Sequence, residues 1–475
     1  MNVLIISTNR NQKPMPVMPL GACLVAQAAE VAGHTVQFLD LMHCRSAGHA
    51  VKKALARHQP DVVGLSIRNI DNNDMQHPEF YPAELATIMR AIGQWREVPI
   101  ILGGAAVSVM PEELLRLTNA TCAVTGDGET AFPALLEKLS TPTAFAVSPG
   151  LCWLDAGVFR QNQTVKAHGS GQCAVPDLPR WLDVKAYQRR LATAPVQSKL
   201  GCHFRCIYCT YRKIEGSSYR LMEPQSVVAA VCKLTAMGFH NIEFVDNVFN
   251  SPYDHALEIC AALARTKHHA RLQTLELNPL YLDDKLIGAM EQAGFVGAGI
   301  TVESASSTVL AKLKKGYSST EVYRAAEVIK RHRLPCLWIF MLGGPGETEQ
   351  TVAESLRFAE TMVRPQDTAF FTVGIRIYPG TELEAIAREE EVLTVSPSQM
   401  LEPVFYLSPH LSRERLLNMV KEAMGRNLRF ISGETIGLSY LPLINSLGAK
   451  LGIEPPLWRY TRFIRRGLRS VGVDA

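Results

Sequence analysis

The residues best suited to chemistry are three cysteines in LGCHFRCIYC, residues 200–209, where Cys202, Cys206 and Cys209 have the spacing CxxxCxxC. A structural zinc ion takes four ligands, and apart from His203 no second pair of ligands follows nearby. Iron–sulfur clusters are bound by thiolates, and a four-iron cluster bound by only three leaves one iron with an open position. The spacing therefore favours a [4Fe-4S] cluster whose free iron can bind a small cofactor, with zinc as the alternative.

Composition limits the class of protein that carries this motif. The chain has 475 residues, 47% of them apolar, which is enough for two or three domains. The 49 basic and 45 acidic side chains are too balanced to indicate a nucleic-acid partner. No apolar run approaches the ~20 residues of a membrane span, and the N-terminus lacks the features of a signal peptide. We therefore expect a cytoplasmic protein.

Cysteine usage agrees with this expectation. Eleven cysteines, an odd number without an export signal, favour reduced thiols and metal chemistry over a disulfide framework. Five of them lie in apolar or helical stretches and are expected to be buried and inert: Cys23, Cys122, Cys232, Cys260 and Cys336.

Alternating strand and helix patterns over residues 1–140 predict a doubly wound, Rossmann-like parallel sheet. Strands are expected at 3–7, 35–40, 61–67, 99–104 and near 123, and helices at 20–34, 47–58, 82–96 and after GDGET. Such a sheet binds its ligand beyond the carboxyl ends of the strands, and a dinucleotide is disfavoured because no GxGxxG follows the first strand. Those ends carry Thr8, Ser66, Arg68, Asn69, Gly103, Gly104, Gly126 and Gly128. The glycines would let backbone approach a ligand, although tight turns alone would also use them.

The rest of the chain divides into three parts. Residues 141–195 are rich in proline and glycine with weak periodicity, and we interpret them as a linker with a small irregular or β segment that crosses into the second domain. Strand and helix patterns alternate again over 196–395, and the cysteine motif lies at the first strand-to-loop junction of this part. Residues 396–475 are predicted to form a helical extension, with a short strand and a long helix over 401–430.

The cysteine motif, with Tyr208 directly before the third cysteine, resembles the radical S-adenosylmethionine superfamily. The resemblance implies a partial (β/α)6 TIM-like barrel whose chemistry lies at the carboxyl ends of the strands. It also implies a [4Fe-4S] cluster on the three cysteines. In that family the cluster's free iron binds S-adenosylmethionine and the reduced cluster cleaves it to a 5′-deoxyadenosyl radical. A flavodoxin or ferredoxin is the expected electron donor.

Four later segments resemble the same family in order. NIEFVDNVFN (241–250) is similar to its second-strand segment, but has FVDN where many members have Gly-Gly-Glu. GITVESASSTVLAKLKKGYS, FMLGGPGETEQT and VGIRIYPGTELEAIAREE are similar to its fourth, fifth and sixth segments. The residues that this resemblance assigns to S-adenosylmethionine are Tyr208, Asp246, Asn247, Glu303, Gly344 and Ile377.

The first 140 residues, placed before such a barrel, resemble the cobalamin-binding domain of class B radical S-adenosylmethionine enzymes. The similar stretches are MPLGACLVAQAAEVAGHTVQFLDL, PDVVGLSI, PIILGGAA and GDGET. The resemblance implies that cobalamin is bound by the polar and glycine residues at the strand ends. The loop after the first strand has no DxHxxG histidine, and His43 follows the second strand at a different spacing. We therefore expect a surface or packing role for His43 and no protein histidine on cobalt.

The two resemblances imply a cobalamin-dependent methyltransferase acting on an unactivated carbon of a lipid or secondary metabolite. Relatives with the same two domains perform oxidative cyclisation or ring rearrangement, and the sequence does not separate these outcomes. A non-catalytic iron–sulfur or zinc redox sensor is the alternative from another class.

The C-terminal stretch PLWRYTRFIRRGLRSVGV, residues 456–473, has no acidic residue. As a helix it places Tyr460, Phe463, Ile464 and Val471 near one face and Arg459, Arg462, Arg466 and Arg469 on another. Such a basic amphipathic helix can lie on an anionic membrane surface, or it can pack on the barrel with its arginines in solvent.

Overall fold

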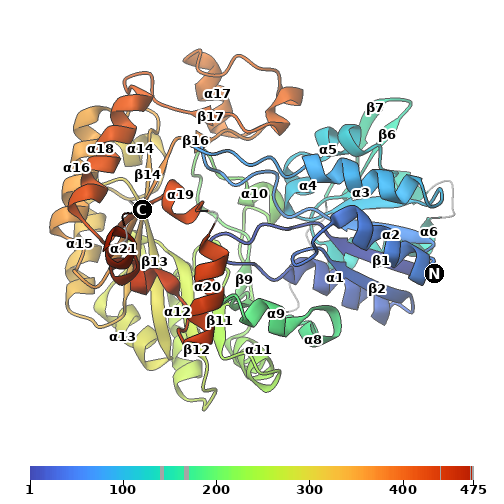
Figure 1. Ribbon diagram of the computed structural model, residues 1–475, viewed down its shortest axis with the longest axis horizontal. Helices are drawn as coiled ribbons and strands as arrows, with labels where there is room; N and C mark the ends of the chain where they lie inside the picture. The colour runs from blue at the N-terminus through green and yellow to red at the C-terminus, as the bar shows by residue number, and fades with distance from the viewer. Residues whose placement is uncertain (140–143, 165–170, 439, 471, 473–475) are drawn as a thin grey trace.

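The computed structural model describes residues 1–139, 144–164, 171–438, 440–470 and 472 (Figure 1). Within these residues the chain folds around two seven-stranded sheets, with two short two-stranded sheets beside them. The first sheet lies in the N-terminal part and the second in the larger C-terminal part, as the blue and the green-to-orange regions of Figure 1 show.

The first sheet is doubly wound, as the sequence predicts. Its strand order is β2 (Thr35–Asp40), β1 (Asn2–Ser7), β3 (Val62–Ser66), β4 (Ile100–Gly103), β5 (Cys122–Val124), β6 (Leu151–Asp155) and β7 (Val158–Gln161). The helices of this part are α1 (Leu20–Val31), α2 (Ala47–His58), α3 (Ala83–Gly93), α4 (Ala105–Val109), α5 (Pro111–Thr118) and α6 (Gly128–Lys138). Helix α1 packs against α6, and α2 packs against α3.

Both faces of the central strands β1, β3 and β4 are buried, which explains their continuous apolar runs. On β1, Val3 and Ile5 belong to the same core as Phe132 of α6, whereas Leu4 and Ile6 belong to a second core with α2 and α3. The alternation follows from the two-residue period of a strand. The sheet therefore holds its carboxyl edge rigidly between two layers of helices.

Residues 141–195, predicted to be a linker with a small irregular or β segment, contain two short strands and three short helices. Strands β6 and β7, both within this stretch, extend the first sheet by antiparallel pairing onto β5. Three short helices, α7 (Ala144–Val147), α8 (Leu178–Trp181) and α9 (Val184–Gln188), lie in the same stretch. Residues 140–143 and 165–170 of the predicted linker lie outside the described residues.

The second sheet is all-parallel and open. Its order is β18 (Phe430–Ser432), β15 (Thr368–Val373), β14 (Cys336–Leu342), β13 (Phe295–Glu303), β12 (Arg271–Leu277), β11 (Asn241–Phe244) and β8 (Ala194–Val196). No pairing joins β8 to β18 among the described residues. The outer helices are α11 (Pro224–Ala236), α12 (Tyr253–Ala264), α13 (Asp284–Gln292), α14 (Ser307–Lys312), α15 (Ser319–Lys330) and α16 (Glu349–Thr361). This is the predicted partial barrel, with a seventh strand supplied by the C-terminal extension.

Shorter elements complete the second part of the chain. Strand β9 (Lys199–Leu200) pairs with β10 (Arg220–Leu221), and β16 (Ile375–Arg376) pairs with β17 (Phe405–Tyr406). The remaining helices are α10 (Tyr211–Ile214), α17 (Glu382–Glu389), α18 (Arg413–Arg426), α19 (Gly433–Ile436), α20 (Leu441–Lys450) and α21 (Thr461–Ser470). Three 3-10 turns accompany them, η1 (Pro279–Tyr281), η2 (Pro397–Leu401) and η3 (Leu457–Tyr460).

The loop that follows β3, residues 67–82, docks the first sheet onto the barrel. The Asp71 carboxylate accepts a hydrogen bond from Arg376 Nε at 2.7 Å, and both side chains are almost fully buried. Tyr378 donates from its hydroxyl to Asn73 Oδ1 at 2.9 Å. These contacts bring the carboxyl end of β3 to the short strand that follows β15.

Candidate functional site

The three cysteines lie on the loop between β9 and α10. Gly201, at the start of this loop, has φ +83°, and a Cβ there would lie 2.1 Å from the Ser218 carbonyl oxygen. Only glycine fits this turn without distortion. The Cys202 amide donates to the Gly216 carbonyl at 3.2 Å, and the Ile207 amide donates to Leu313 at 3.3 Å. The loop is thus fixed at both ends.

The three thiols lie close enough to influence one another. Burial raises the pKa of the Cys209 thiol to about 12, and the neighbouring Cys206 and Cys202 raise it further, while Lys315 opposes the rise. Burial and Cys206 likewise raise the pKa of Cys202. Binding of a metal must therefore displace protons from these thiols, as thiolate ligation generally does.

The donor set fits a cluster better than a single ion. Across the described parts of the chain, no three His, Cys, Asp or Glu side chains converge so that they could hold one metal ion. A four-iron cluster takes one thiolate on each of three irons, so the donor set of Cys202, Cys206 and Cys209 matches what such a cluster requires. A closed structural zinc site would need a fourth ligand besides these three thiols.

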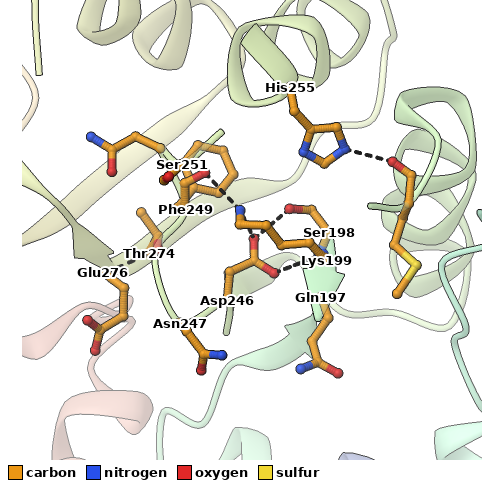
Figure 2. Close-up of polar contacts among 12 residues, drawn as sticks. Gln197, Ser198, Lys199, Asp246, Asn247, Phe249, Ser251, His255, Thr274 and Glu276 are labelled. Carbon is orange, nitrogen blue, oxygen red and sulfur yellow. Dashed lines mark hydrogen bonds and ion pairs between the residues drawn. The ribbon is translucent and has the colours of Figure 1, made fainter. Parts of the chain in front are cut away.

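Asp246 anchors the strand that precedes the cysteine loop (Figure 2). Its carboxylate accepts hydrogen bonds from the Ser198 amide at 2.7 Å and the Ser198 hydroxyl at 2.6 Å. The Lys199 ammonium lies 3.5 Å from the same carboxylate and donates to the Phe249 carbonyl at 3.0 Å. Lys199 and Asp246 are almost completely buried, and burial lowers the pKa of Lys199. The predicted contact of Asp246 with S-adenosylmethionine stays a prediction.

The neighbouring Asn247 is less enclosed. Its side-chain amide donates to Glu215 Oε2 at 2.6 Å, and Glu215 also accepts a hydrogen bond from the Gly201 amide at 3.0 Å. In Figure 2 the side chains of Gln197, Asn247 and Glu276 point to the same side, away from the buried pair of Lys199 and Asp246. Asn247 thus links β11 to the cysteine loop through Glu215.

Tyr208, Glu303 and Lys315 form a second buried network beside the thiols. The Tyr208 hydroxyl donates to Glu303 Oε1 at 2.8 Å. The Lys315 ammonium donates to the same oxygen at 3.0 Å and to the Tyr208 hydroxyl at 3.1 Å. Glu303, at the end of β13, has φ +61°, a conformation that non-glycine residues rarely adopt and that clusters at functional sites. The structure thus joins the fourth strand to the cysteine motif.

Gly344 and Ile377, the last two residues predicted to contact S-adenosylmethionine, are enclosed by other side chains. A Cβ at Gly344 would approach Leu313 Cδ2 at 3.3 Å, so the turn after β14 leaves little room there. Ile377 is fully buried in the core. Neither position is brought into contact with Tyr208 or Asp246 by a hydrogen bond, and their contacts with S-adenosylmethionine stay predictions.

Glu276, at the end of β12, is a residue that the sequence analysis missed. Burial raises the pKa of its carboxyl to about 8, and the nearby Glu303 raises it further, while Lys315 lowers it. Lys315 was also missed, although it lies within the fourth segment, GITVESASSTVLAKLKKGYS. Nothing in the sequence distinguishes it from the nearby Lys312 and Lys314.

The residues predicted for the cobalamin site gather at the carboxyl edge of the first sheet. The Thr8 amide and hydroxyl both donate to the Ser66 carbonyl, at 3.1 and 3.0 Å. The Ile67 amide donates to the Gly103 carbonyl at 2.8 Å, and the Gly126 amide donates to the Ser108 hydroxyl at 3.2 Å. These bonds connect the ends of β1, β3, β4 and β5.

A pocket of about 370 Å³ opens at this edge, and Thr8, Arg68 and Asn69 line it together with residues of α3. Gly103 ends β4 and Gly104 follows it, and neither lines this pocket. A Cβ at Gly104, which has φ +101°, would lie 2.5 Å from the Ile67 carbonyl, while a Cβ at Gly103 would meet open space. Gly128 begins α6, where a Cβ would approach Val25 at 3.1 Å.

This edge fits part of a large amide-bearing ligand, since it combines polar side chains with open space. The pocket has the size of a small-ligand site, and its use by cobalamin stays a prediction. The burial of cobalamin against each predicted residue stays a prediction.

His43 has a packing role, as expected. Its ring stacks edge-to-face on Tyr187 at 4.8 Å between centroids, and its Nδ1 lies 2.9 Å from Arg190 NH1. Burial and the neighbouring arginines lower the pKa of His43 to about 4. The histidine joins the first sheet to the segment after α9.

Comparison with protein families finds two matches in this order. The B12 binding domain matches residues 12–136, and the radical SAM superfamily matches residues 197–359. The second range includes the three cysteines, Asp246 and Glu303.

Comparison with individual proteins agrees. The chain is 24% identical over 419 residues to an uncharacterized methyltransferase of Pyrococcus horikoshii, a match that covers 85% of this chain and 86% of the relative. It is 24% identical over 322 residues to hopanoid C-3 methylase of Methylococcus capsulatus, covering 65% of this chain and 58% of the relative.

The fold matches a solved structure over nearly its whole length. The radical S-adenosylmethionine methyltransferase TsrM of Kitasatospora setae, whose structure holds cobalamin and a [4Fe-4S] cluster, has a TM-score of 0.86 to this chain at 20% identity. The match covers 99% of each chain. At this identity the likeness shows a shared fold.

Proposed function

Since the chain joins a B12 binding domain to a radical SAM domain, we propose that it is a cobalamin-dependent radical S-adenosylmethionine methyltransferase. One observation carries the proposal. The three thiols of the cysteine motif lie together at the carboxyl end of an open parallel barrel, onto which the carboxyl edge of the N-terminal sheet is docked by Asp71 and Arg376.

The chain's own residues would divide the work as follows. Cys202, Cys206 and Cys209 would hold the cluster, and Lys315 would supply a fixed positive charge beside it. The polar edge with Thr8 and Arg68 would hold cobalamin. When bound, the cluster supplies the electron that cleaves S-adenosylmethionine, and cobalamin carries the methyl group. The enclosing barrel would exclude water and so protect reactive species.

The substrate that we propose is a small molecule with an unactivated carbon, in the form of a lipid or a secondary metabolite. The similarity to hopanoid C-3 methylase supports a lipid. Oxidative cyclisation or rearrangement by the same architecture is the second candidate, because a 22% identical relative is the anaerobic magnesium-protoporphyrin IX monomethyl ester cyclase of Rubrivivax gelatinosus.

We further propose that the enzyme acts in the cytoplasm, where flavodoxin or ferredoxin supplies its electrons. All eleven cysteines are free thiols, which supports a reducing compartment. No helix among the described residues has both the length and the apolar character needed to cross a bilayer.

Anaerobic reconstitution tests the proposal. The wild-type chain should bind about four irons and four sulfides, retain cobalamin, and form 5′-deoxyadenosine from S-adenosylmethionine after reduction. Cys206→Ala should lose the cluster and this cleavage while keeping cobalamin, because the two sites lie on different sheets. Cys232→Ala, on α11 and outside the motif, is the matched control and should keep both.

The opposite results would reject the function. A chain that takes up one zinc ion and leaves S-adenosylmethionine intact would be a zinc protein. Retention of the cluster in Cys206→Ala would show that the cysteine motif does not bind it.

A further inference from the structure

Helix α20 presents an apolar stripe to solvent. Leu443, Leu447 and Leu451 are 71%, 56% and 71% exposed. Their spacing of four residues places all three on one side of the helix. Single exposed leucines are common on protein surfaces, whereas two on α20 and a third at its C-cap, all on one side, together make an apolar surface.

The opposite side of α20 is fixed to the protein. The buried Asn445 donates to the Pro14 carbonyl at 2.7 Å, and Gly448 packs beside Leu191 and Ile453. The helix therefore does not need its leucines to stay attached.

Helix α21, which the sequence predicts to be basic and amphipathic, uses two of its arginines to pack against the protein. Its residue Arg465 is buried and donates to the Asn427 and Phe430 carbonyls at 2.8 and 2.6 Å. Arg469 donates to the Met424 and Gly425 carbonyls, so it belongs to the packed side and not to a free stripe. Tyr460 and Ile464 are half-buried, and Val471 lies outside the described residues.

The outer side of α21 is basic with one large apolar residue. Phe463 is 68% exposed, and Arg462 and Arg466 are exposed beside it. Residues 455–470 contain no acidic side chain, and no ion pair binds these two arginines within the parts of the chain that the structure describes. Both α20 and α21 lie on the side of the molecule that faces the viewer in Figure 1.

We propose that the exposed leucines of α20, together with Phe463, Arg462 and Arg466 of α21, dock the protein onto an anionic lipid bilayer. Leucine and phenylalanine side chains enter the interface between headgroups and acyl chains, while arginines pair with anionic headgroups. A two-fold contact with a second copy would bring no acidic side chain of this stretch to the arginines, since residues 455–470 contain none.

The location gives this docking a consequence for the site. Pro442, in the first turn of α20, lines the pocket that also holds Arg68 and Asn69. A bilayer at this surface would lie beside the route to the proposed cobalamin edge, as an enzyme of lipids requires. This link to the substrate rests on the proposed function, whereas the docking itself does not.

Sedimentation with vesicles tests the docking on the full chain with its cofactors. We expect binding to vesicles of phosphatidylcholine with phosphatidylglycerol, weaker binding to phosphatidylcholine alone, and release by salt, because screening weakens charge attraction. The double variant Leu443→Ser, Leu447→Ser and the double variant Arg462→Glu, Arg466→Glu should each bind about tenfold or more weakly. Lys52→Glu with Lys53→Glu, two exposed lysines of α2, is the charge-matched control and should bind as the wild type does.

Three results would overturn the proposal. The first is that binding does not depend on phosphatidylglycerol. The second is that both double variants bind vesicles as tightly as the wild type does. The third is that the α2 control loses as much binding as the double variants do. Sedimentation velocity without vesicles adds a further one, since a dimer dissociated by the leucine variant, without vesicle binding, would assign the stripe to a second copy. Vesicle binding is measured without turnover, so its failure is distinct from failure of the methyltransferase function.

Discussion

Asp246, predicted to contact S-adenosylmethionine, has a structural role in the folded chain. Both carboxylate oxygens accept hydrogen bonds from Ser198, and Lys199 adds its charge. A buried carboxylate is tolerated only when it is paired and hydrogen-bonded in this way. At this scale the pair positions the cysteine loop, which begins two residues after Lys199.

Glu347 is a second buried carboxyl, and it makes stability depend on pH. It is fully buried and accepts hydrogen bonds from the Gly343 and Gly344 amides, and its Oε1 has no hydrogen-bond partner among the described residues. Burial raises its pKa to about 7. In the unfolded chain the group ionises near 4.5, so between these values folding takes up a proton and the free energy of unfolding falls as pH rises.

We therefore expect Glu347→Gln to gain stability relative to the wild type from pH 5 to pH 7.5, by on the order of 2 kcal/mol. Melting temperatures at both pH values measure this difference. Glu349→Gln, at an exposed carboxylate of the same segment, is the control and should show no such trend. A difference between Glu347→Gln and wild type that does not change with pH would contradict the assignment.

At the scale of elements, the turn into the cysteine loop depends on Gly201. A Cβ at this position would collide with the Ser218 carbonyl at 2.1 Å, in a backbone conformation that alanine rarely adopts. Gly201→Ala should therefore lower stability by about 1–3 kcal/mol and reduce iron incorporation, because the loop must shift. Iron content and melting temperature of the reconstituted protein measure both effects.

Gly21→Ala provides the comparison, since a Cβ there meets nothing within 4 Å at the start of α1. It should leave stability unchanged or slightly higher, because alanine favours a helix. If Gly201→Ala bound iron as well as Gly21→Ala, the turn would not control the loop.

The sequence predicted those elements whose pattern is local. Helices at 20–31 and 47–58 and the strand at 35–40 appear nearly as predicted, because buried strands and amphipathic helices have clear periodicity. Strand β18 was missed, since it has three residues and its pairing partner β15 lies in another part of the chain. The hairpin of β6 and β7, with five and four residues, was expected only as a small irregular or β segment without bounds.

The site divides in the same way. The three cysteines are adjacent in sequence, so their spacing alone indicated the chemistry. Lys315 and Glu276 became visible only when strands far apart in sequence came together. The leucines of α20 have helical spacing, but spacing does not tell a buried side from an exposed one.

At the scale of the whole molecule, the buried pair of Asp71 and Arg376 joins the two sheets. Asp71→Asn would leave the Arg376 guanidinium buried without its counter-charge, although three carbonyl oxygens still accept its hydrogen bonds. Loss of one partner of a buried pair costs about 3–5 kcal/mol. We expect a lower melting temperature and faster hydrogen exchange in the loop of residues 67–82.

The exposed pair of Asp155 and Arg160 is the matched control. Asp155→Asn should change stability by less than about 1 kcal/mol, as surface pairs usually do. Equal effects of the two substitutions would show that the docking of the sheets does not depend on Asp71.

Strand β18 places the end of the barrel inside the C-terminal extension. It lies in the C-terminal extension, yet it pairs with β15 and covers that strand's outer backbone groups. The match to the radical SAM superfamily ends at residue 359, before either strand begins. A fragment cut at that match, or anywhere before residue 430, would leave an uncovered row of amides and carbonyls, which invites aggregation. The sequence signature and the cooperative folding unit therefore have different borders.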